Sequence, residues 1–484
     1  MKYQITLMPS GQVLTADAGV TLLSALRQGH HPVDAPCGGQ GKCQKCTVTI
    51  DGNEVLACRT IVDRDMTVLQ PQAQTLRILT GAEEMPVTFD PVAPGYLLAF
   101  DIGTTTVAGY LLDKSTGRTL VTASAANPQA AFGGDVISRI QAALRGQMEE
   151  LTERIRSCLQ QLTIELCRNA SITPEQIGVV SIVGNPAMQQ LFMGILPDNL
   201  ATVPFSPVLT KAQIHPGHRY LPLWSEANVL IVPDIAGYVG ADTVAGILAC
   251  GMDTDEITTL LVDIGTNGEM VLGNQFRLVA CSTAAGPALE GANIQFGMRA
   301  APGAIDHVRV ERGKFVCSVI GGGQARGICG SGLIDAVAAA LELGLLNSRG
   351  KILHPEGRIP LADGIYLTQE DIRQLQLAKG AIAAGIQLLT QHLGLALEDI
   401  HRVCLAGAFG SYLDPASACR IGLLPPTLLP KITAMGNTAG SGARMLACSR
   451  QALERTQALT DSVEALELAS APTFSRCFAQ NMRF

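Results

Sequence analysis

The same pattern of strand, polar turn and strand occurs in two distant parts of this chain. The first copy covers residues 96–112, and the second covers residues 260–272. In each copy an apolar run ends at an aspartate, Asp101 or Asp263, which opens a turn with glycine and threonine before a second apolar run begins. Strand-like runs joined by such turns are typical of β-hairpins. The duplication predicts two related lobes.

Longer segments with helical periodicity alternate with strand-like runs from residue 96 onward. Residues 147–168 and 335–345 are two such helical segments. This alternation is typical of an α/β domain. We therefore expect two lobes, approximately residues 96–255 and 256–448, followed by a C-terminal tail.

The composition excludes several classes of protein. Of the 484 residues, 47% are hydrophobic and only 16% are charged, against a charged share of about 25% in a typical domain. Such a chain buries large cores, which excludes a disordered protein. The 35 basic and 42 acidic residues give a net charge of −7 without any basic block, so we expect no nucleic-acid partner and no binding to anionic membranes.

The same features predict the compartment. No run of about 18 apolar residues occurs, so we expect no membrane-spanning helix. The first residues alternate like an opening strand and contain no apolar signal core, so we expect a cytoplasmic protein. Because the cytosol keeps thiols reduced, the 14 cysteines should be metal ligands or buried apolar side chains, not a disulfide framework.

Four cysteines, Cys37, Cys43, Cys46 and Cys58, lie close together near the start of the chain. A close triplet followed by a later fourth cysteine suits the thiolate ligands of a 2Fe-2S cluster. A zinc site built from the same thiolates is one alternative, although zinc ribbons usually carry two close pairs. Structural free thiols are the other alternative.

Glycines surround the first three of these cysteines. Gly38, Gly39 and Gly41 allow positive φ angles and let backbone N–H groups approach sulfur atoms. Residues 37–46 resemble the cluster loop of a ferredoxin domain, and the resemblance covers residues 1–75. It implies an α+β module of the β-grasp type that carries one electron. Residues 76–95 contain several prolines and little periodicity, which predicts a tethering linker.

The two aspartate turns are candidates for holding phosphate. Neither a Walker A loop nor a Gly-x-Gly-x-x-Gly motif occurs. In each turn the aspartate can hold Mg²⁺ directly or through water, and the following residues offer N–H and hydroxyl donors to phosphate oxygens. A single such turn often closes an ordinary hairpin, whereas two in an α/β chain favour a phosphate site. The candidates are Asp101 and Asp263 as catalytic residues, with Gly103, Thr104, Thr105, Gly265, Thr266, Asn267 and Gly268 as phosphate-binding residues.

This pair of turns resembles the phosphate loops of the ASKHA superfamily, which comprises acetate kinase, sugar kinases, heat-shock chaperones and actin. The resemblance implies an ATPase domain of two ribonuclease-H-like lobes that clamp ATP between them. It also implies an adenosine loop at residues 405–411, a nucleotide-contacting helix start at residues 327–332 and a connecting segment at residues 436–442. Packing glycines and simple loops are the alternative explanations. The nucleotide-binding candidates in these segments are Gly330, Ser331, Gly407, Ala408, Phe409, Gly410 and Gly440.

Two polar residues are candidates for positioning the water that attacks ATP. Asn185 and Asp234 each follow an apolar strand-like run, where interlobe connections place catalytic groups, although either could be structural. Asp135 and Glu290 are weaker candidates of the same kind.

A one-electron carrier joined to an ATPase suggests that ATP drives an uphill electron transfer through a conformational change. This combination, together with residues 127–135 and 286–294, resembles the reductive activators of corrinoid proteins over nearly the whole chain. The resemblance implies transfer of one electron from the 2Fe-2S cluster to the Co(II) corrinoid of a methyltransferase or O-demethylase corrinoid protein, which regenerates Co(I). It also implies a corrinoid protein and an upstream low-potential electron donor as partners, and a homodimer. One departure is expected: family members carry a middle domain where this chain has only a short linker.

Three other functions stay open at this stage. The protein could be an ATP-dependent redox activator of another metalloenzyme. It could be a nucleotide-gated binding or maturation protein whose cluster senses the redox state. It could also be a small-molecule kinase with a regulatory ferredoxin, which would form a phosphorylated product.

Overall fold

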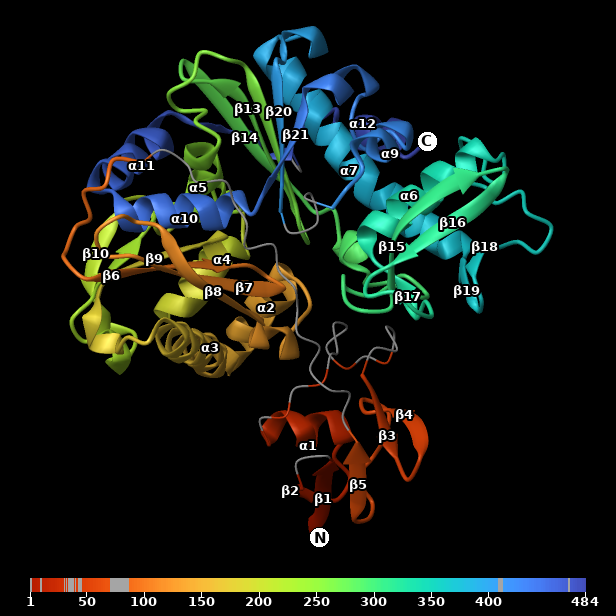
Figure 1. Ribbon diagram of the computed structural model, residues 1–484, viewed down its shortest axis with the longest axis horizontal. Coiled ribbons are helices and arrows are strands. Elements are labelled where there is room, and N and C mark those ends of the chain that lie inside the picture. The colour runs from red at the N-terminus through yellow and green to blue at the C-terminus, as the bar shows by residue number, and fades with distance from the viewer. Residues whose placement is uncertain are drawn as a thin grey trace.

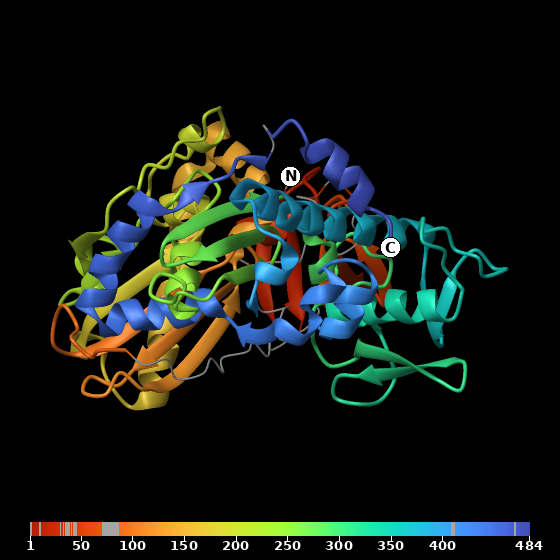
Figure 2. The same ribbon diagram turned by 90° about the horizontal axis from the view of Figure 1, so that it is seen from above.

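The computed structural model describes residues 2–8, 11–29, 31, 33, 39, 41, 46–69, 87–407, 412–468 and 471–484. Figure 1 shows a small N-terminal module below a large domain. Seen from above, the module lies behind the middle of the large domain (Figure 2).

The N-terminal module is a five-stranded sheet with one helix. Its strands follow the order β2-β1-β5-β3-β4, with β1 parallel to β5 and antiparallel to β2. Thr21 caps the helix by accepting the backbone N–H of Ser24, and the helix buries Leu22, Leu23 and Leu26. This is the predicted β-grasp arrangement. The elements are β1 (Lys2–Met8), β2 (Gln12–Asp17), α1 (Leu22–Gln28), β3 (Thr47–Ile50), β4 (Asn53–Leu56) and β5 (Met66–Leu69).

The first lobe of the large domain is a six-stranded sheet in the order β10-β11-β9-β6-β7-β8. An antiparallel meander of β6, β7 and β8 is extended by β9 and β11, which run parallel to β6. Side chains alternate along β6, so that Leu98 and Phe100 pack on one face of the sheet and Leu97 and Ala99 on the other. The strands are β6 (Tyr96–Ile102), β7 (Thr106–Leu112), β8 (Thr119–Ala126), β9 (Ile177–Gly184), β10 (Gln213–Pro216) and β11 (Asn228–Ile231).

The second lobe repeats this topology in the order β21-β20-β12-β13-β14-β22. Here β12, β13 and β14 form the meander, and β20 and β21 extend it in parallel. Five strands match in order and direction, whereas the sixth, β10 or β22, lies at opposite edges of the two sheets. The shared five-stranded arrangement confirms the predicted pair of ribonuclease-H-like lobes. The strands are β12 (Thr259–Ile264), β13 (Gly268–Asn274), β14 (Arg277–Thr283), β20 (Arg402–Ala406), β21 (Ile432–Gly436) and β22 (Glu464–Ala465).

Two helices, α5 (Ala241–Ala249) and α10 (Thr438–Cys448), lie between the two large sheets (Figure 1). Their buried side chains share one core with one face of each sheet. Gly442 allows the helices to cross closely, because a Cβ there would stand 2.1 Å from the carbonyl oxygen of Ala245. The helix α10 also packs against β6 and β9 of the first lobe. The predicted second lobe, residues 256–448, therefore ends in a helix that both lobes share.

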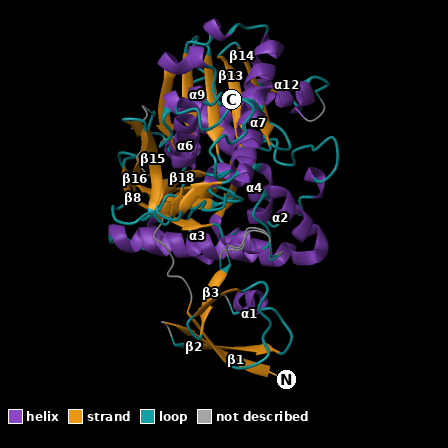
Figure 3. Ribbon diagram, turned by 90° about the vertical axis from the view of Figure 1, so that its right-hand side faces the viewer, coloured by secondary structure: helices purple, strands orange, loops and turns teal. Residues whose placement is uncertain are grey.

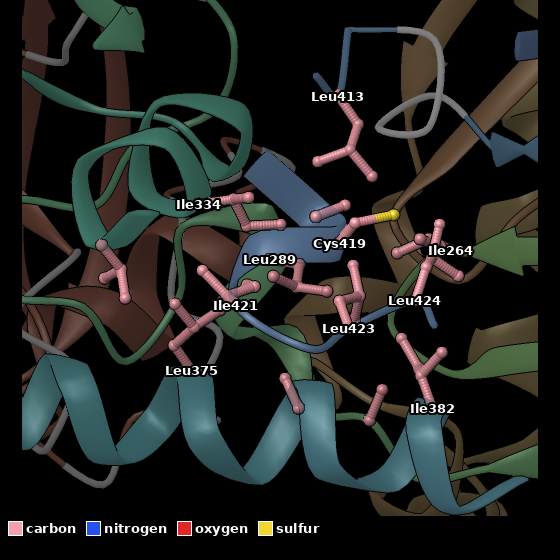
Figure 4. Close-up of a cluster of buried hydrophobic side chains, with 14 of the residues drawn as sticks. Ile264, Leu289, Ile334, Leu375, Ile382, Leu413, Cys419, Ile421, Leu423 and Leu424 are labelled. Carbon is pink, nitrogen blue, oxygen red and sulfur yellow. The ribbon is translucent and has the colours of Figure 1, made fainter. Parts of the chain in front are cut away.

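Helices cover the outer faces of both sheets. The first sheet packs against α3 (Met148–Ala170) and α4 (Pro186–Met193), and the second packs against α7 (Gln369–Leu393), while α6 (Gly330–Glu342) shares the same core and packs against β15 (Ala304–Glu311). Figure 4 shows part of the second core, where Leu289 lies near Ile334 and Ile421 above α7. None of the helices in the described ranges is long and apolar enough to cross a membrane.

The second lobe also carries a small sheet, β16-β15-β17, and a separate hairpin, β18 and β19, which project to one side (Figure 1). The short helix α9 (Pro415–Arg420) packs against α6. The strands are β15 (Ala304–Glu311), β16 (Lys314–Val319), β17 (Gly327–Ile328), β18 (Ile359–Ala362) and β19 (Ile365–Leu367), and the remaining helix of the first lobe is α2 (Val136–Ala142).

The residues expected as a C-terminal tail are folded onto the large domain. The segment contains α11 (Arg450–Ser462), β22, which pairs in parallel with β14, and α12 (Phe474–Asn481), which packs along α7. The buried ammonium of Lys379 in α7 donates hydrogen bonds to the carbonyl oxygens of Gly422 and Arg483. These contacts fix the last residues of the chain.

Part of the predicted linker also belongs to the large domain. Residues 70–86 lie outside the described residues. Asp90 accepts a 2.6 Å hydrogen bond from the Ser449 hydroxyl, and Phe89 and Val92 pack against the core between the sheets. Residues 87–95 are therefore anchored, which corrects the expectation that they form a linker.

The module contacts the large domain at α3. Figure 3 shows α3 along the side of the large domain that faces the module. Arg154 of α3 donates a 3.1 Å hydrogen bond to the carbonyl oxygen of Arg27, near the end of α1.

Candidate functional site

Asp101 and Asp263 lie at corresponding places in the two lobes. Each stands near the end of a central strand, β6 or β12, before the turn into the next strand. Asp101 accepts a 2.8 Å hydrogen bond from the side-chain amide of Asn437, which caps α10. Burial raises the pKa of each aspartate from 3.8 to about 7. Repulsion from Asp101 contributes to the raised pKa of Asp263, so the fold brings the two turns together.

A third aspartate, Asp242, faces this pair from the first turn of α5. Burial raises the pKa of Asp242 to about 6, and its charge adds to the raised pKa values of Asp101 and Asp263. Burial and repulsion from Asp242 hold the pKa of Glu269 well above its usual value. Desolvated acidic groups of this kind favour a divalent cation. In the described ranges, no three His, Cys, Asp or Glu side chains form a finished metal site.

Sequence reasoning missed Asp242, Glu269 and Asn437 as members of the site. Asp242 is an acidic residue inside an otherwise apolar helical sequence, which is a signal that the sequence carries. Asn437 lies in the predicted connecting segment, residues 436–442, but its contact with Asp101 was not predicted. Glu269 offered no comparable signal, because only the packing of the two sheets brings it to Asp242.

The turn of the first lobe requires glycine at position 103. The N–H of Gly103 donates a 2.9 Å hydrogen bond to the carbonyl oxygen of Thr106. A Cβ on Gly103 would stand 2.7 Å from that same oxygen. The carbonyl oxygen of Gly103 accepts a 2.8 Å hydrogen bond from the Asn127 amide. The turn is therefore held from both sides.

The turn of the second lobe closes in the same way. The N–H of Gly265 donates a 2.9 Å hydrogen bond to the carbonyl oxygen of Asn267, whose side chain also hydrogen-bonds to Glu269. A Cβ on Gly265 would meet that carbonyl oxygen only at 3.7 Å, so this position has room for a side chain. A Cβ on Gly268 would stand 3.0 Å from Ile382, which packs this turn against α7.

The hydroxyls of Thr105 and Thr266 meet between the two turns. Their Oγ1 atoms are 3.2 Å apart. Both hydroxyls donate to the same carboxylate oxygen, Oε2 of Glu290, at 2.8 Å from Thr105 and 2.9 Å from Thr266. One carboxylate therefore joins the phosphate-loop candidates of the two lobes.

Asn185 uses both ends of its side chain inside the first lobe. Its amide nitrogen donates a 3.2 Å hydrogen bond to the Thr104 hydroxyl, and its oxygen accepts the N–H of Met188 at 3.1 Å as the N-cap of α4. The structure thus places Asn185 as a support for Thr104.

Arg139 supports the same turn from beneath. Its buried guanidinium donates to the carbonyl oxygens of Thr104 and Gly133. Burial lowers the pKa of Arg139 to about 9, and the negative charges of Asp135 and Glu290 oppose this shift. A buried cation therefore lies within electrostatic reach of the Glu290 carboxylate.

Asp234 is almost fully buried at the start of α5. Its Oδ1 accepts the N–H of Ala241 at 3.2 Å, and its Oδ2 has no hydrogen-bond partner among the described residues. Burial, together with repulsion from Asp242, holds the pKa of Asp234 well above its usual value. Its position next to Asp242 places it at the rim of the acidic group rather than at the threonine pair.

Two glycines allow close approach of the backbone at the site, Gly407 to Asp263 and Gly440 to Tyr110. Gly407 has a φ of 92°, and a Cβ there would stand 2.7 Å from Oδ1 of Asp263. A Cβ on Gly440 would stand 2.5 Å from the Tyr110 hydroxyl, and the N–H of Gly440 bonds the Asn437 oxygen at 2.7 Å. Ala408, Phe409 and Gly410 lie outside the described residues.

Gly330 and Ser331 form the buried start of α6. Ser331 is 2% exposed, and its hydroxyl lies 3.3 Å from the sulfur of Cys329. A Cβ on the following residue, Gly332, would stand 2.3 Å from the carbonyl oxygen of Ile305 in β15. This helix start is therefore packed against β15.

A cavity of about 670 Å³ lies between α6, β15 and α9. His307 and the buried Asp335 are joined by a 2.9 Å hydrogen bond, which raises the pKa of His307. Oδ1 of Asp335 has no hydrogen-bond partner among the described residues. Tyr412 follows the predicted adenosine loop directly and lines the cavity. Other polar lining residues are Arg309, Glu342, Asp414 and Arg420.

Two of the four predicted cluster ligands, Cys46 and Cys58, lie within the described residues and are buried. The N–H of Cys58 donates a hydrogen bond to the sulfur of Cys46 at 3.4 Å, a type of contact that tunes iron–sulfur clusters. Gly39 and Gly41 have φ angles of 91° and 73°, as predicted for the loop. Arg59 donates a 3.0 Å hydrogen bond to the carbonyl oxygen of Gly41, next to the pair. The thiol pair, the N–H donor and the glycine loop fit an iron–sulfur cluster.

Cys37, Cys43 and Gly38 lie outside the described residues. The complete ligand set of the cluster is therefore still a prediction.

These features define a class of protein: a ferredoxin-type module joined to a two-lobed domain of the ASKHA type. Three family models match the chain in succession. The 2Fe-2S iron-sulfur cluster binding domain matches residues 5–71, the RACo middle region matches residues 96–255, and the C-terminal ASKHA domain of RACo matches residues 257–484.

Full-length relatives agree with this division. The corrinoid activation enzyme RamQ of Eubacterium limosum is 32% identical over 94% of each chain. The Co(II) methylated amine-specific corrinoid protein reductase of Methanosarcina barkeri is 30% identical over 79% of this chain and 76% of its own length. The solved structure of a reductive activator for corrinoid, iron-sulfur protein is 28% identical, with a TM-score of 0.75, and covers 100% of this chain and 98% of its own. The chain belongs to the family of reductive activators of corrinoid proteins.

The expected departure from this family is wrong. We predicted that the middle region of the family is missing, because only a short linker follows the ferredoxin module. The middle-region model matches residues 96–255, which form the first ribonuclease-H-like lobe. The mistake arose because the middle region has the fold of an ATPase lobe.

Proposed function

We propose that this protein uses ATP hydrolysis to transfer one electron from a 2Fe-2S cluster in its N-terminal module to the Co(II) corrinoid of a methyltransferase or O-demethylase corrinoid protein, regenerating Co(I). The observation that carries the proposal is the shared carboxylate between Thr105 and Thr266, because it joins hydroxyl donors of both lobes at one point. Such convergence is what an ATP-dependent clamp requires.

The cluster would be held by Cys37, Cys43, Cys46 and Cys58. Bound there, it would accept and release one electron. The buried pair Cys46 and Cys58, with its N–H donor to sulfur, supports this assignment. A low-potential electron donor would supply the electron.

Mg²⁺ and the phosphates would bind between the lobes. Mg²⁺ is usually held by one or two carboxylates together with water and phosphate oxygens. Asp101, Asp242 and Asp263 are the carboxylates that would hold it, because all three are buried and the charge of Asp242 repels those of the other two. Thr105 and Thr266 would donate to phosphate oxygens.

The nucleoside would occupy the cavity beside Tyr412. Gly407 lies next to Asp263, and Tyr412 lines the cavity. These two residues lie within and directly after the predicted adenosine loop, so the loop links the aspartates to the cavity. The unpartnered oxygen of Asp335 would accept a hydrogen bond from the nucleoside there.

ATP would act through the lobes. Each 59 mV of uphill transfer of one electron costs about 1.4 kcal/mol, and a conformational change can supply this only if nucleotide binds one state better than another. The helices α5 and α10 lie between the lobes and carry Asp242 and Asn437 of the site. A change in the phosphates bound at the site is therefore transmitted through these two helices to both sheets. Arg154, which contacts the N-terminal module, belongs to the first lobe, so a movement of this lobe also acts on the module.

The test is anaerobic. The reduced protein is mixed with a Co(II) corrinoid protein, with Mg-ATP or with a non-hydrolysable analogue, and the Co(I) absorbance is followed. We expect Co(I) only with Mg-ATP, and none with Cys58→Ser. The matched control Cys317→Ser should behave as the wild type, because Cys317 lies on β16 of the second lobe, outside the module. ATP hydrolysis without Co(I) on every corrinoid protein tried would refute the electron acceptor.

A further inference from the structure

Glu290 is the carboxylate at the meeting point of the two phosphate turns, and neither family resemblance nor similarity to relatives assigns it a role. We propose that Glu290 orients the water that attacks the terminal phosphate of ATP and accepts a proton from it. The inference rests on the proposed ATP hydrolysis and adds the residue that carries out its first step.

The backbone holds Glu290 rigidly. It ends a short 3₁₀ turn, Pro287–Glu290, whose Ala288 and Leu289 are buried in the second core (Figure 4). The next residue, Gly291, has a φ of 79°, and a Cβ there would stand 2.5 Å from the carbonyl oxygen of Met298. The carboxylate is thus aimed by a packed turn, and a general base needs such fixed placement.

The hydroxyls of Thr105 and Thr266 mark the position at which the terminal phosphate would bind. Both donate to Oε2 of Glu290 in this structure. When a phosphate oxygen takes these donors, it comes to lie next to the carboxylate. The carboxylate and the phosphate are both anions and repel each other. A water molecule between them relieves this repulsion in one of two orientations. It donates one hydrogen to the carboxylate and one to the phosphate, or it turns its oxygen toward phosphorus. Glu290 favours the second orientation, because its free oxygen accepts one of the water hydrogens.

The other candidates for this role are engaged elsewhere. Both ends of the Asn185 side chain bond within the first lobe, to Thr104 and Met188. Asp234 accepts the N–H of Ala241 in α5 and is repelled by Asp242. Asp135 caps α2 by accepting the N–H of Ser138. Glu290 alone among the four candidates contacts residues of both turns.

A buried cation lies within electrostatic reach of Glu290. The guanidinium of Arg139 is buried and interacts electrostatically with Glu290 and Asp135. Its hydrogen bonds go to the carbonyl oxygens of Thr104 and Gly133 and to the sulfur of Met188, which are all neutral. Arg139 therefore holds the turn of the first lobe and offsets negative charge beside it.

The step balances as follows. The water oxygen forms a bond to the γ-phosphorus, and the bond from that phosphorus to the β,γ-bridging oxygen breaks. ADP leaves with the bonding electron pair, and one water proton passes to Glu290. Glu290 then releases this proton to phosphate or solvent. No electron enters or leaves, so this step needs no reductant.

The test compares Glu290→Gln with the wild type in the full-length protein. Single-turnover hydrolysis of Mg-ATP is measured, alongside the dissociation constant for Mg-ATP. We expect hydrolysis to fall about 10²–10³-fold, while ATP binds as tightly as before or more tightly. Glu153→Gln, an exposed residue of α3, is the matched control and should leave both values unchanged.

A second variant separates chemistry from folding. Glu290→Ala should regain hydrolysis when formate is added, whereas a structural defect would not respond to formate. Hydrolysis by Glu290→Gln within threefold of the wild type would overturn the inference, as would a loss of ATP affinity that accounts for the whole defect. If the wild type hydrolyses no ATP at all, the proposed function fails with it. Normal hydrolysis in both the wild type and Glu290→Gln would refute the role of Glu290 and leave the proposed function intact.

Discussion

Replacing Gly442 with alanine should drive apart the two helices that join the lobes. The new Cβ would stand 2.1 Å from the carbonyl oxygen of Ala245 and 2.5 Å from its carbonyl carbon and its Cα. These are backbone atoms, so no rotamer change relieves the contact. The helices must separate by about 1 Å before the distance reaches the shortest that Cβ atoms adopt, which opens a close-packed layer.

Two opposing effects set the magnitude. Alanine is favoured over glycine inside a helix by about 1 kcal/mol, whereas overpacking a rigid core costs about 1–3 kcal/mol and occasionally more. Because the clash involves backbone, we expect the cost to prevail, with a net loss of about 2 kcal/mol, which lowers the Tm of a domain of this size by about 2–3 °C. Lobe closure should suffer as well, because α5 carries Asp242 and α10 carries Asn437.

Differential scanning calorimetry and steady-state ATP hydrolysis test this reasoning. The matched control is Gly380→Ala in α7, where the nearest atom to a new Cβ is Met482 Cγ at 3.3 Å, on a flexible side chain. The control gains the same helix propensity with far less strain, so its Tm should stay the same or rise. An unchanged or higher Tm for Gly442→Ala would refute the argument from close crossing.

The remaining predictions concern the acidic group, the linker and the cluster. Because burial raises the pKa of Asp101 and Asp263 to about 7, the folded protein binds protons that the unfolded chain has already lost. Without Mg²⁺, Tm should therefore fall as pH rises from about 5 to about 8, and Mg²⁺ should flatten the profile; a Tm that rises over this range contradicts the assignment. Asp90→Ala loses the 2.6 Å hydrogen bond from Ser449, so we expect a loss of about 1 kcal/mol and faster limited proteolysis before residue 95, whereas equal proteolysis would show that other contacts anchor this segment. Cys58→Ser should abolish the visible absorption of the cluster and keep ATP hydrolysis, and a retained absorption would remove Cys58 from the ligand set.

Local patterns were enough for much of the fold and for parts of the site. The repeated turns at Asp101 and Asp263 predicted two lobes, because a strand, turn and strand need only contacts between neighbours in sequence. The glycines at positions 39 and 41 were predicted from the same kind of local requirement, and both adopt positive φ. The middle region was misjudged, because fold alone does not tell an ATPase lobe from a family-specific region.

The sequence by itself determined the class of chemistry, namely thiolates near the start of the chain and a pair of aspartate turns after it. Only the tertiary structure decided which side chains meet. Asn437 reaches Asp101 across 336 residues of chain, and Glu290 reaches Thr105 across 185. Neither contact follows from periodicity or spacing, because both depend on how two separate sheets pack around α5 and α10. Long-range packing of this kind is set by the fit of whole buried surfaces, and no short stretch of sequence encodes it.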